Sequence, residues 1–241
     1  MSSRQSRLLL MLAVGPLAPD LVASQSMDSV KTSRPPILTA REAIGAAGGL
    51  VIAAAFDTKV KTAAQTNRNA GRNGIASIGN SFGNGLYVGP ALAAVWIAGK
   101  ASGHEDVSSA AIWAAGSGAV AGVATLGIKA IIGRRRPPGG DAFAFHPLSG
   151  DASFPSGHTS FAFAIASSLA YSTKDHWSDV IFYSAATLTG LSRINDNKHW
   201  LSDVVGGAVL GILVGRQLHY GAKRTRIVAG PGTIGFAVAT R

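Results

Sequence analysis

Long apolar segments rich in alanine and glycine dominate this chain. None of them alternates apolar and polar residues with the period of two that is typical of a half-buried strand, and most are longer than a typical strand. We therefore predict an all-α fold, a bundle of about six helices. Polar, glycine-rich stretches such as 66–74 are expected loops. The expected helices are 41–56, 84–99, 107–133, 159–172, 179–193 and 200–218.

The lengths of these segments are compatible with either a membrane or a water-soluble domain. A helix needs about 20 mostly apolar residues to span a bilayer. Only 107–133 clearly reaches that length, whereas 159–172 and 179–193 contain 14 and 15 residues. They are either short or tilted membrane spans or the core helices of a water-soluble domain.

The N-terminal region has the pattern of an export signal. Arg4 and Arg7 precede the apolar run "LLLMLAVGPLA", and small residues follow it. This order predicts a signal peptide over residues 1–25, with a disordered or anchoring segment as the alternative. We expect the protein to be exported, and to lie in the periplasm or in the inner membrane with its active site facing the periplasm.

The rest of the chain divides by composition. Residues 26–40 are polar and contain a double proline, which is typical of a linker. We expect one helical domain over 41–220. In the tail, 221–241, two β-prone runs flank Pro231 and Gly232, which indicates either a small β-hairpin or a frayed terminus.

The formal net charge of +10 favours an anionic partner, namely phosphate, an anionic membrane surface or nucleic acid. Nucleic acid is not expected, because no basic motif is interleaved with aromatic residues. The chain has no cysteine, which excludes disulfides, thiolate chemistry and cysteine-ligated metal. Nothing in the sequence indicates the oligomeric state.

The stretch 129–137, "KAIIGRRRP", contains the first candidate anion site. Lys129 and Arg136 are seven residues apart, about two helical turns, so both can project from one face. Arg136 offers a fork of donors to paired oxygens, and Lys129 adds a point charge. The alternative is a basic cluster beside a membrane that includes Arg134 and Arg135.

The stretch 155–158, "PSGH", stands at the start of an expected helix. The unpaired N–H groups at such a start favour an anion. Ser156 can add a hydroxyl donor, and Gly157 permits close approach. His158 can transfer a proton to a leaving oxygen. The alternative is a simple helix cap with an incidental surface histidine.

The stretch 192–203, "SRINDNKHWLSD", places His199 and Asp203 four residues apart. On a helical face the carboxylate can orient the imidazole and leave its other nitrogen free to attack. Arg193 supplies another guanidinium for phosphate oxygens. The alternative is an exposed His–Asp pair that only stabilises a helix.

Together these stretches closely resemble the signature of the type 2 phosphatidic acid phosphatase and vanadium haloperoxidase superfamily. That signature is Lys-x6-Arg-Pro, Pro-Ser-Gly-His and Ser-Arg-x5-His-x3-Asp, and every fixed position is matched, with 17 and 33 residues between the blocks. The resemblance covers about 84–218 and implies the helical fold of that superfamily.

The resemblance also implies a role for each matched residue. His199 would be the nucleophile that forms a phosphohistidine, Asp203 would orient it, and His158 would protonate the leaving group. No cofactor and no metal are implied. The residues implied to bind the phosphoryl oxygens are Lys129, Arg136, Ser156, Gly157 and Arg193.

The expected activity is therefore metal-independent hydrolysis of phosphomonoesters or pyrophosphates, with lipid phosphates as the favoured substrates. The alternatives are a soluble periplasmic non-specific acid phosphatase and a vanadium-dependent haloperoxidase. Haloperoxidase chains tend to be much larger, which disfavours the second. A non-catalytic basic module that binds an anionic membrane is a further class.

Overall fold

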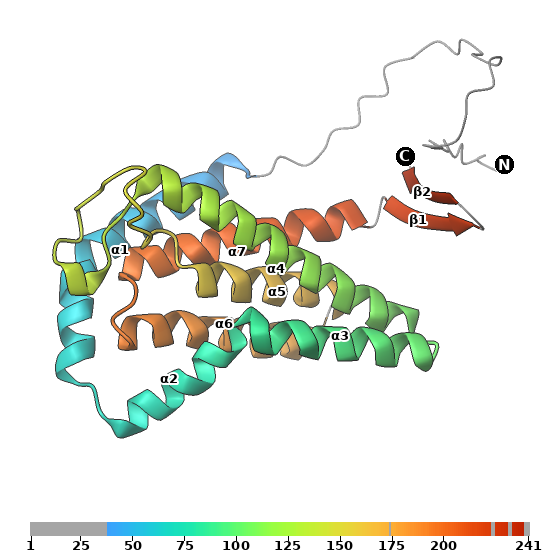
Figure 1. The fold of residues 1–241 in the computed structure, drawn as a ribbon, viewed down its shortest axis with the longest axis horizontal. Coiled ribbons are helices and arrows are strands. Elements are labelled where there is room, and N and C mark those ends of the chain that lie inside the picture. Colours follow the sequence, from blue (N-terminus) through green and yellow to red (C-terminus); the bar gives the residue numbers. More distant parts are fainter. Residues whose placement is uncertain (1–37, 174, 223–224, 231–232, 239–241) are drawn as a thin grey trace, which may run out of the picture. The chain divides into compact units, whose positions relative to one another are not determined.

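The computed structural model describes residues 38–173, 175–222, 225–230 and 233–238. The all-α prediction is confirmed, with one helix more than expected in this part of the chain (Figure 1). The expected signal peptide and residues 26–37 of the expected linker lie outside the described residues. The helices are α1 (Ala40–Thr66), α2 (Ala70–Phe82), α3 (Gly85–Ala101), α4 (Glu105–Ile132), α5 (Gly157–Thr173), α6 (His176–Asn195) and α7 (Leu201–Ala222).

The additional helix is α2, which begins inside the expected loop 66–74. The side chain of Asn69 caps it by accepting the N–H of Arg72 at 2.9 Å. On the other side, Gly79 lies so close to α6 that an added Cβ would be 2.7 Å from the carbonyl oxygen of Leu188. Packing on α6 therefore outweighs the low helix propensity of the asparagine, glycine and serine residues in α2.

Helix α5 packs against α4, α6 and α7 (Figure 1). With the exception of Ile165, its buried residues are alanine, serine and threonine. The facing side of α7 carries glycines, and a Cβ added at Gly211 or Gly215 would lie 2.5 Å from a carbonyl oxygen of α5. Small residues on both helices allow this close backbone contact, as in membrane helix bundles. The contact holds the N-terminus of α5 in place.

Replacement of Gly211 by alanine is expected to destabilise the bundle. The new methyl group would meet the backbone of α5 at Ser160, which cannot move aside as a flexible side chain can. We expect a loss of about 1–3 kcal/mol in unfolding free energy, measured as a lower thermal midpoint of the purified protein. Gly122→Ala is the matched control, because nothing lies within 4 Å of a Cβ there. Equal midpoints for Gly211→Ala and the wild type would refute this packing.

Three helices are long and apolar enough to cross a membrane. They are α1, α4 and residues Leu201–His219 of α7, with mean hydropathies of 1.4, 1.6 and 1.4. The pair α2–α3, bent by 52°, would be a fourth if it forms one span. The sequence clearly indicated only 107–133. The expected first helix stopped at residue 56, short of the observed end at Thr66, and the expected segment 200–218 was not identified as a span.

Large apolar side chains on these helices face outward. Ile44 in α1 is 73% exposed, Leu86 in α3 82% and Val123 in α4 72%. A helix that carries apolar residues on its exposed side as well as its packed side is typical of a membrane span. The helix lengths and this surface fit a membrane protein.

The expected tail hairpin is present as two antiparallel strands, β1 (Thr225–Gly230) and β2 (Thr233–Val238). Their register runs from Thr225 opposite Val238 to Gly230 opposite Thr233. The turn residues Pro231 and Gly232 lie outside the described residues. The hairpin belongs to a different compact unit from helices α1 to α6.

Candidate active site

The three sequence stretches that carry the predicted site meet in space. They lie at the end of α4 and in the loop after it, at the start of α5, and in the connection between α6 and α7 (Figure 1). His158, at the start of α5, is within electrostatic range of residues from all the other stretches. Those residues are Lys129, Arg136, Arg193 and His199.

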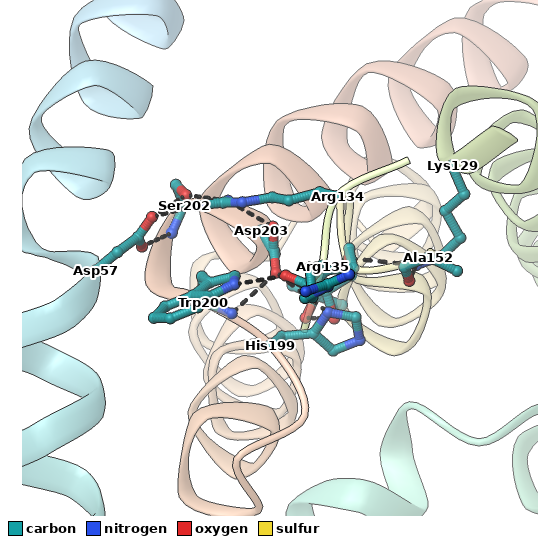
Figure 2. Close-up of polar contacts among 12 residues, drawn as sticks. Asp57, Lys129, Arg134, Arg135, Ala152, His199, Trp200, Ser202 and Asp203 are labelled. Atoms are coloured by element: carbon teal, nitrogen blue, oxygen red, sulfur yellow. Dashed lines mark hydrogen bonds and ion pairs between the residues drawn. The ribbon is translucent and has the colours of Figure 1, made fainter. Parts of the chain in front are cut away.

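The carboxylate of Asp203 is the most tightly held group of the site (Figure 2). Its side chain is fully buried in the first turn of α7. Oδ2 accepts hydrogen bonds from the Ser153 hydroxyl at 2.5 Å and from the Trp200 N–H at 2.9 Å. Oδ1 accepts one from Arg134 Nη1 at 2.7 Å. Four elements thus fix the orientation of this carboxylate: the loop before α5, the loop after α4, the α6–α7 connection and α7 itself.

His199 lies beside Asp203, in the connection between α6 and α7. The residue is 5% exposed, and Nδ1 is 3.4 Å from Asp203 Oδ2. Within the part of the chain that the structure describes, Nδ1 makes no well-aligned hydrogen bond. A modest movement of the ring would convert the contact into one, and such bonds often tighten when a substrate binds.

Burial lowers the pKa of His199 below the usual imidazole value, and the contact with Asp203 opposes this shift. The cations Lys129 and Arg193 lower the pKa further. The ring is therefore neutral at neutral pH. A neutral imidazole with Nδ1 directed at a carboxylate leaves Nε2 as a free nucleophile.

Two of the predicted phosphate-binding cations, Lys129 and Arg193, lie within electrostatic range of this histidine. Lys129 Nζ donates to the carbonyl oxygens of Ala152 and Ser153, the latter at 3.2 Å. Arg193 Nη1 donates to Asn80 Oδ1 at 2.7 Å, whereas its Nε has no partner among the described residues. The side chain of Arg136 is exposed and lines a cavity of about 330 Å³. The other residues that line this cavity are Arg135, Gly139, Gly150, Asp151 and Ala152.

The start of α5 is hydrogen-bonded to α7 and also has N–H and O–H groups that can donate to a ligand. The Ser156 N–H donates to the carbonyl oxygen of Asp203 at 2.9 Å, and its hydroxyl oxygen accepts from Thr159 Oγ1 at 2.8 Å. Ser156 therefore joins α5 to α7 and keeps one hydroxyl hydrogen to donate. The first-turn amides, beginning at Gly157, have no carbonyl partner within the helix. A Cβ at Gly157 would lie 4.0 Å from Lys129 Cε, so the glycine faces the lysine.

Two charged residues that the sequence did not single out belong to this site. Arg134 is 3% exposed, although one interpretation of the sequence placed it in a surface basic cluster. Asp57, in α1, is 1% exposed, and its Oδ2 accepts a hydrogen bond from Arg134 Nη2 at 2.7 Å. The available signal for Asp57 was a carboxylate directly after an apolar segment. Arg135, by contrast, is exposed and forms a 3.7 Å pair with Asp151.

Asn80 in α2 is a third residue that the sequence did not indicate. Its Oδ1 accepts from Arg193 and from the Ser192 hydroxyl at 2.8 Å, and its Nδ2 donates to Asp196 Oδ2 at 2.6 Å. Asn80 therefore fixes the position of Arg193. No sequence signal marks it, because α2 itself was expected to begin as a loop.

Residues 110–226 match the family described as the PAP2 superfamily. The chain carries a PAP2 superfamily domain. All three stretches of the site fall inside the match, whereas Asp57 and Asn80 lie before it. In the part of this chain that the structure describes, no group of three or more histidine, aspartate or glutamate side chains is arranged to hold a metal ion. Metal independence stays a prediction.

The curated relatives of this chain are named as phosphatases. The lipid A 1-phosphatase of Porphyromonas gingivalis is 46% identical over 89 residues, which are 36% of this chain and 18% of that protein. The undecaprenyl-diphosphatase BcrC of Bacillus subtilis is 34% identical over 135 residues, 52% of this chain and 62% of that protein. The aligned region spans less than two thirds of either relative.

Two solved structures share the fold. One is a transmembrane PAP2 type phosphatidylglycerolphosphate phosphatase from Bacillus subtilis, with a TM-score of 0.60 and 22% identity over 75% of this chain and 95% of that one. The other is LpxE of Aquifex aeolicus, with a TM-score of 0.51 and 23% identity over 68% of this chain and 94% of that one. These likenesses extend the shared fold beyond the PAP2 match itself.

Proposed function

We propose that this chain is a metal-independent phosphatase that hydrolyses phosphorylated lipids, either monoesters or pyrophosphates. The observation that carries the proposal is the buried, neutral His199 in contact with Asp203 and surrounded by Lys129 and Arg193. This arrangement supplies a nucleophile, the group that orients it and cations for a phosphoryl group. The names of the relatives, lipid A 1-phosphatase and undecaprenyl-diphosphatase, support a lipid substrate.

The chemistry proceeds in two steps. Nε2 of His199 attacks phosphorus, the bond from phosphorus to the leaving oxygen breaks, and His158 gives that oxygen a proton. Water then attacks the phosphorus of the phosphohistidine, His158 accepts a proton from that water, and the bond from phosphorus to Nε2 breaks, which frees His199 and inorganic phosphate. Asp203 stabilises the positive charge that the ring of His199 carries between the steps.

The phosphoryl oxygens bear the negative charge of both transition states. Catalysis of phosphoryl transfer is mostly positioning and charge stabilisation. We assign this role to the cations of the site and to the start of α5. The residues are Lys129, Arg136, Ser156, Gly157 and Arg193.

The position of the site at helix ends suits a lipid substrate. With α1, α4 and α7 across a bilayer, the headgroup of a lipid can enter the cation cluster while its tails stay in the membrane. We propose that the protein is exported to the inner membrane with this site facing the periplasm.

Phosphate release from a substrate panel tests this proposal. We expect purified protein to release phosphate from phosphatidic acid, an isoprenyl pyrophosphate or lipid A in the presence of EDTA, with competitive inhibition by vanadate. Loss of activity with the chelator would contradict a metal-free site. Release from soluble esters alone would favour a non-specific acid phosphatase, and peroxide-driven bromination without phosphate release would favour a haloperoxidase.

The dependence of kcat/KM on pH should reflect the lowered pKa of His199. Protonation of His199 removes the nucleophile, so the loss of activity on the acid side follows the pKa of this residue. We expect the acid limb to have its midpoint below about 6.5, the usual value for histidine. A midpoint above that value would show that Asp203 raises the pKa of His199 more than burial lowers it. That result would contradict a neutral His199 at neutral pH.

A further inference from the structure

A buried ion-pair network joins α1 to the first turn of α7 (Figure 2). Asp57 Oδ2 and Asp203 Oδ1 each accept a hydrogen bond from one guanidinium, that of Arg134, at 2.7 Å. All three side chains are at most 3% exposed. Loss of one partner from a buried pair leaves an uncompensated charge, so such contacts strongly constrain the positions of their members.

Every nitrogen of the planar Arg134 guanidinium donates at least one hydrogen bond. Nη1 donates to Ser202 Oγ at 2.6 Å as well as to Asp203, while Nη2 and Nε both donate to the carbonyl oxygen of Ala142, at 2.6 and 2.9 Å. A lysine ammonium, as a single point of charge, cannot reproduce this fork. The orientation of the guanidinium is therefore fixed independently of Asp203.

Asp57 holds the same helix turn from the other side. Its Oδ1 accepts the backbone N–H of Ser202 at 2.8 Å, and its Oδ2 accepts the Ser202 hydroxyl at 2.7 Å. Ser202 is the second residue of α7, so Asp57 satisfies one of the amides that a helix start leaves unpaired. Asp57 thus anchors both Arg134 and the turn that carries Asp203.

The network also has an electrostatic consequence. Two carboxylates share one guanidinium, which leaves a negative charge beside His199. That charge compensates the positive charge of a phosphorylated or protonated ring. The other charged or titratable groups around His199 are Lys129, Arg193 and His158.

We propose that Arg134 and Asp57 are positioning residues for the reaction, which hold the carboxylate of Asp203 in the orientation that His199 requires. The inference rests on the proposed phosphatase function. Arg134 lies within the stretch 129–137, but at a position that the signature leaves unspecified. Asp57 lies before the PAP2 match, so α1 completes the site from outside the matched region.

The test compares kcat with KM in two variants. Arg134→Lys keeps the charge and loses the fork, and we expect kcat to fall about 10- to 100-fold, the range typical of partners that orient a site residue. Asp57→Asn keeps the shape and loses one charge, and we expect a fall of about 10-fold. KM and the vanadate inhibition constant should stay within about two-fold, because the phosphate-binding residues are untouched.

Arg216→Gln is the matched control. Arg216 also joins α7 to α1, through an ion pair with Glu42, but it follows Asp203 by 13 residues in the same helix, about 20 Å along its axis. Its kcat should equal that of the wild type. A wild-type kcat in both Arg134→Lys and Asp57→Asn would overturn the proposal, as would a loss that lies wholly in KM. If Arg134→Lys does not fold, the Asp57→Asn variant alone tests the proposal: a wild-type kcat, or a loss only in KM, would overturn it.

An NMR titration of His199 separates this inference from the proposed function, because it needs no turnover. Arg134→Gln removes a positive charge next to Asp203 and should raise the pKa of His199, whereas Asp57→Asn should lower it. An inactive wild type with these opposite shifts would refute the phosphatase and leave the positioning network in place. An active wild type with no shift in either variant would refute the network alone.

Discussion

Replacement of His199 by alanine is expected to lower the rate of phosphate release by at least about 10,000-fold, a loss typical of a missing nucleophile. The side chain is buried, and a methyl group leaves no other nucleophile in contact with Asp203. The measurement is steady-state phosphate release from the best lipid substrate at saturating concentration. Vanadate binding should survive, because the cations remain.

His176→Ala is the control for this variant. His176 is an exposed histidine at the start of α6, outside the site, and its removal should leave the rate unchanged. If the His199→Ala protein kept more than about a hundredth of wild-type activity, another group would be the nucleophile.

The second large effect is expected for Asp203→Asn, with a fall in kcat of about 1,000- to 10,000-fold. The amide cannot accept all the hydrogen bonds that the carboxylate receives from Ser153, Trp200 and Arg134. It also cannot compensate the positive charge on His199. The amide group can stabilise the wrong tautomer of the ring, which removes the nucleophilic lone pair.

The split between kcat and KM distinguishes this role from phosphate binding. KM should change little in Asp203→Asn, because the carboxylate does not contact the phosphoryl group in our account. A large rise in KM with kcat preserved would assign Asp203 to substrate binding instead. A thermal midpoint close to that of the wild type shows that the loss is not due to unfolding.

The sequence predicted the parts of this site that depend on local spacing. The residues of each stretch are close in sequence, but they do not share one helix as the spacing suggested. Helix α4 ends at Ile132, before Arg136, and α7 begins at Leu201, after His199. The structure brings all three stretches close to one another. Local pattern suffices here because the chemistry of each stretch depends on residues close in sequence.

The sequence did not predict features that depend on contacts between residues far apart in the chain. Arg134, Arg135 and Arg136 are consecutive and identical, yet Arg134 is buried while its two neighbours are exposed. The difference comes from Asp57, which lies 77 positions away in the chain. The same holds for α2, whose helical state depends on its contact with α6, and hence for Asn80.

The central claim is that phosphate passes through His199, and a single-turnover experiment tests it most directly. Labelled substrate is mixed with excess protein, the reaction is quenched in alkali, where phosphohistidine is stable, and the labelled peptide is sequenced by mass spectrometry. We predict a transient phosphoryl group on His199 that forms before free phosphate appears. Phosphate released with no protein-bound label, or label on any other residue, would contradict the account.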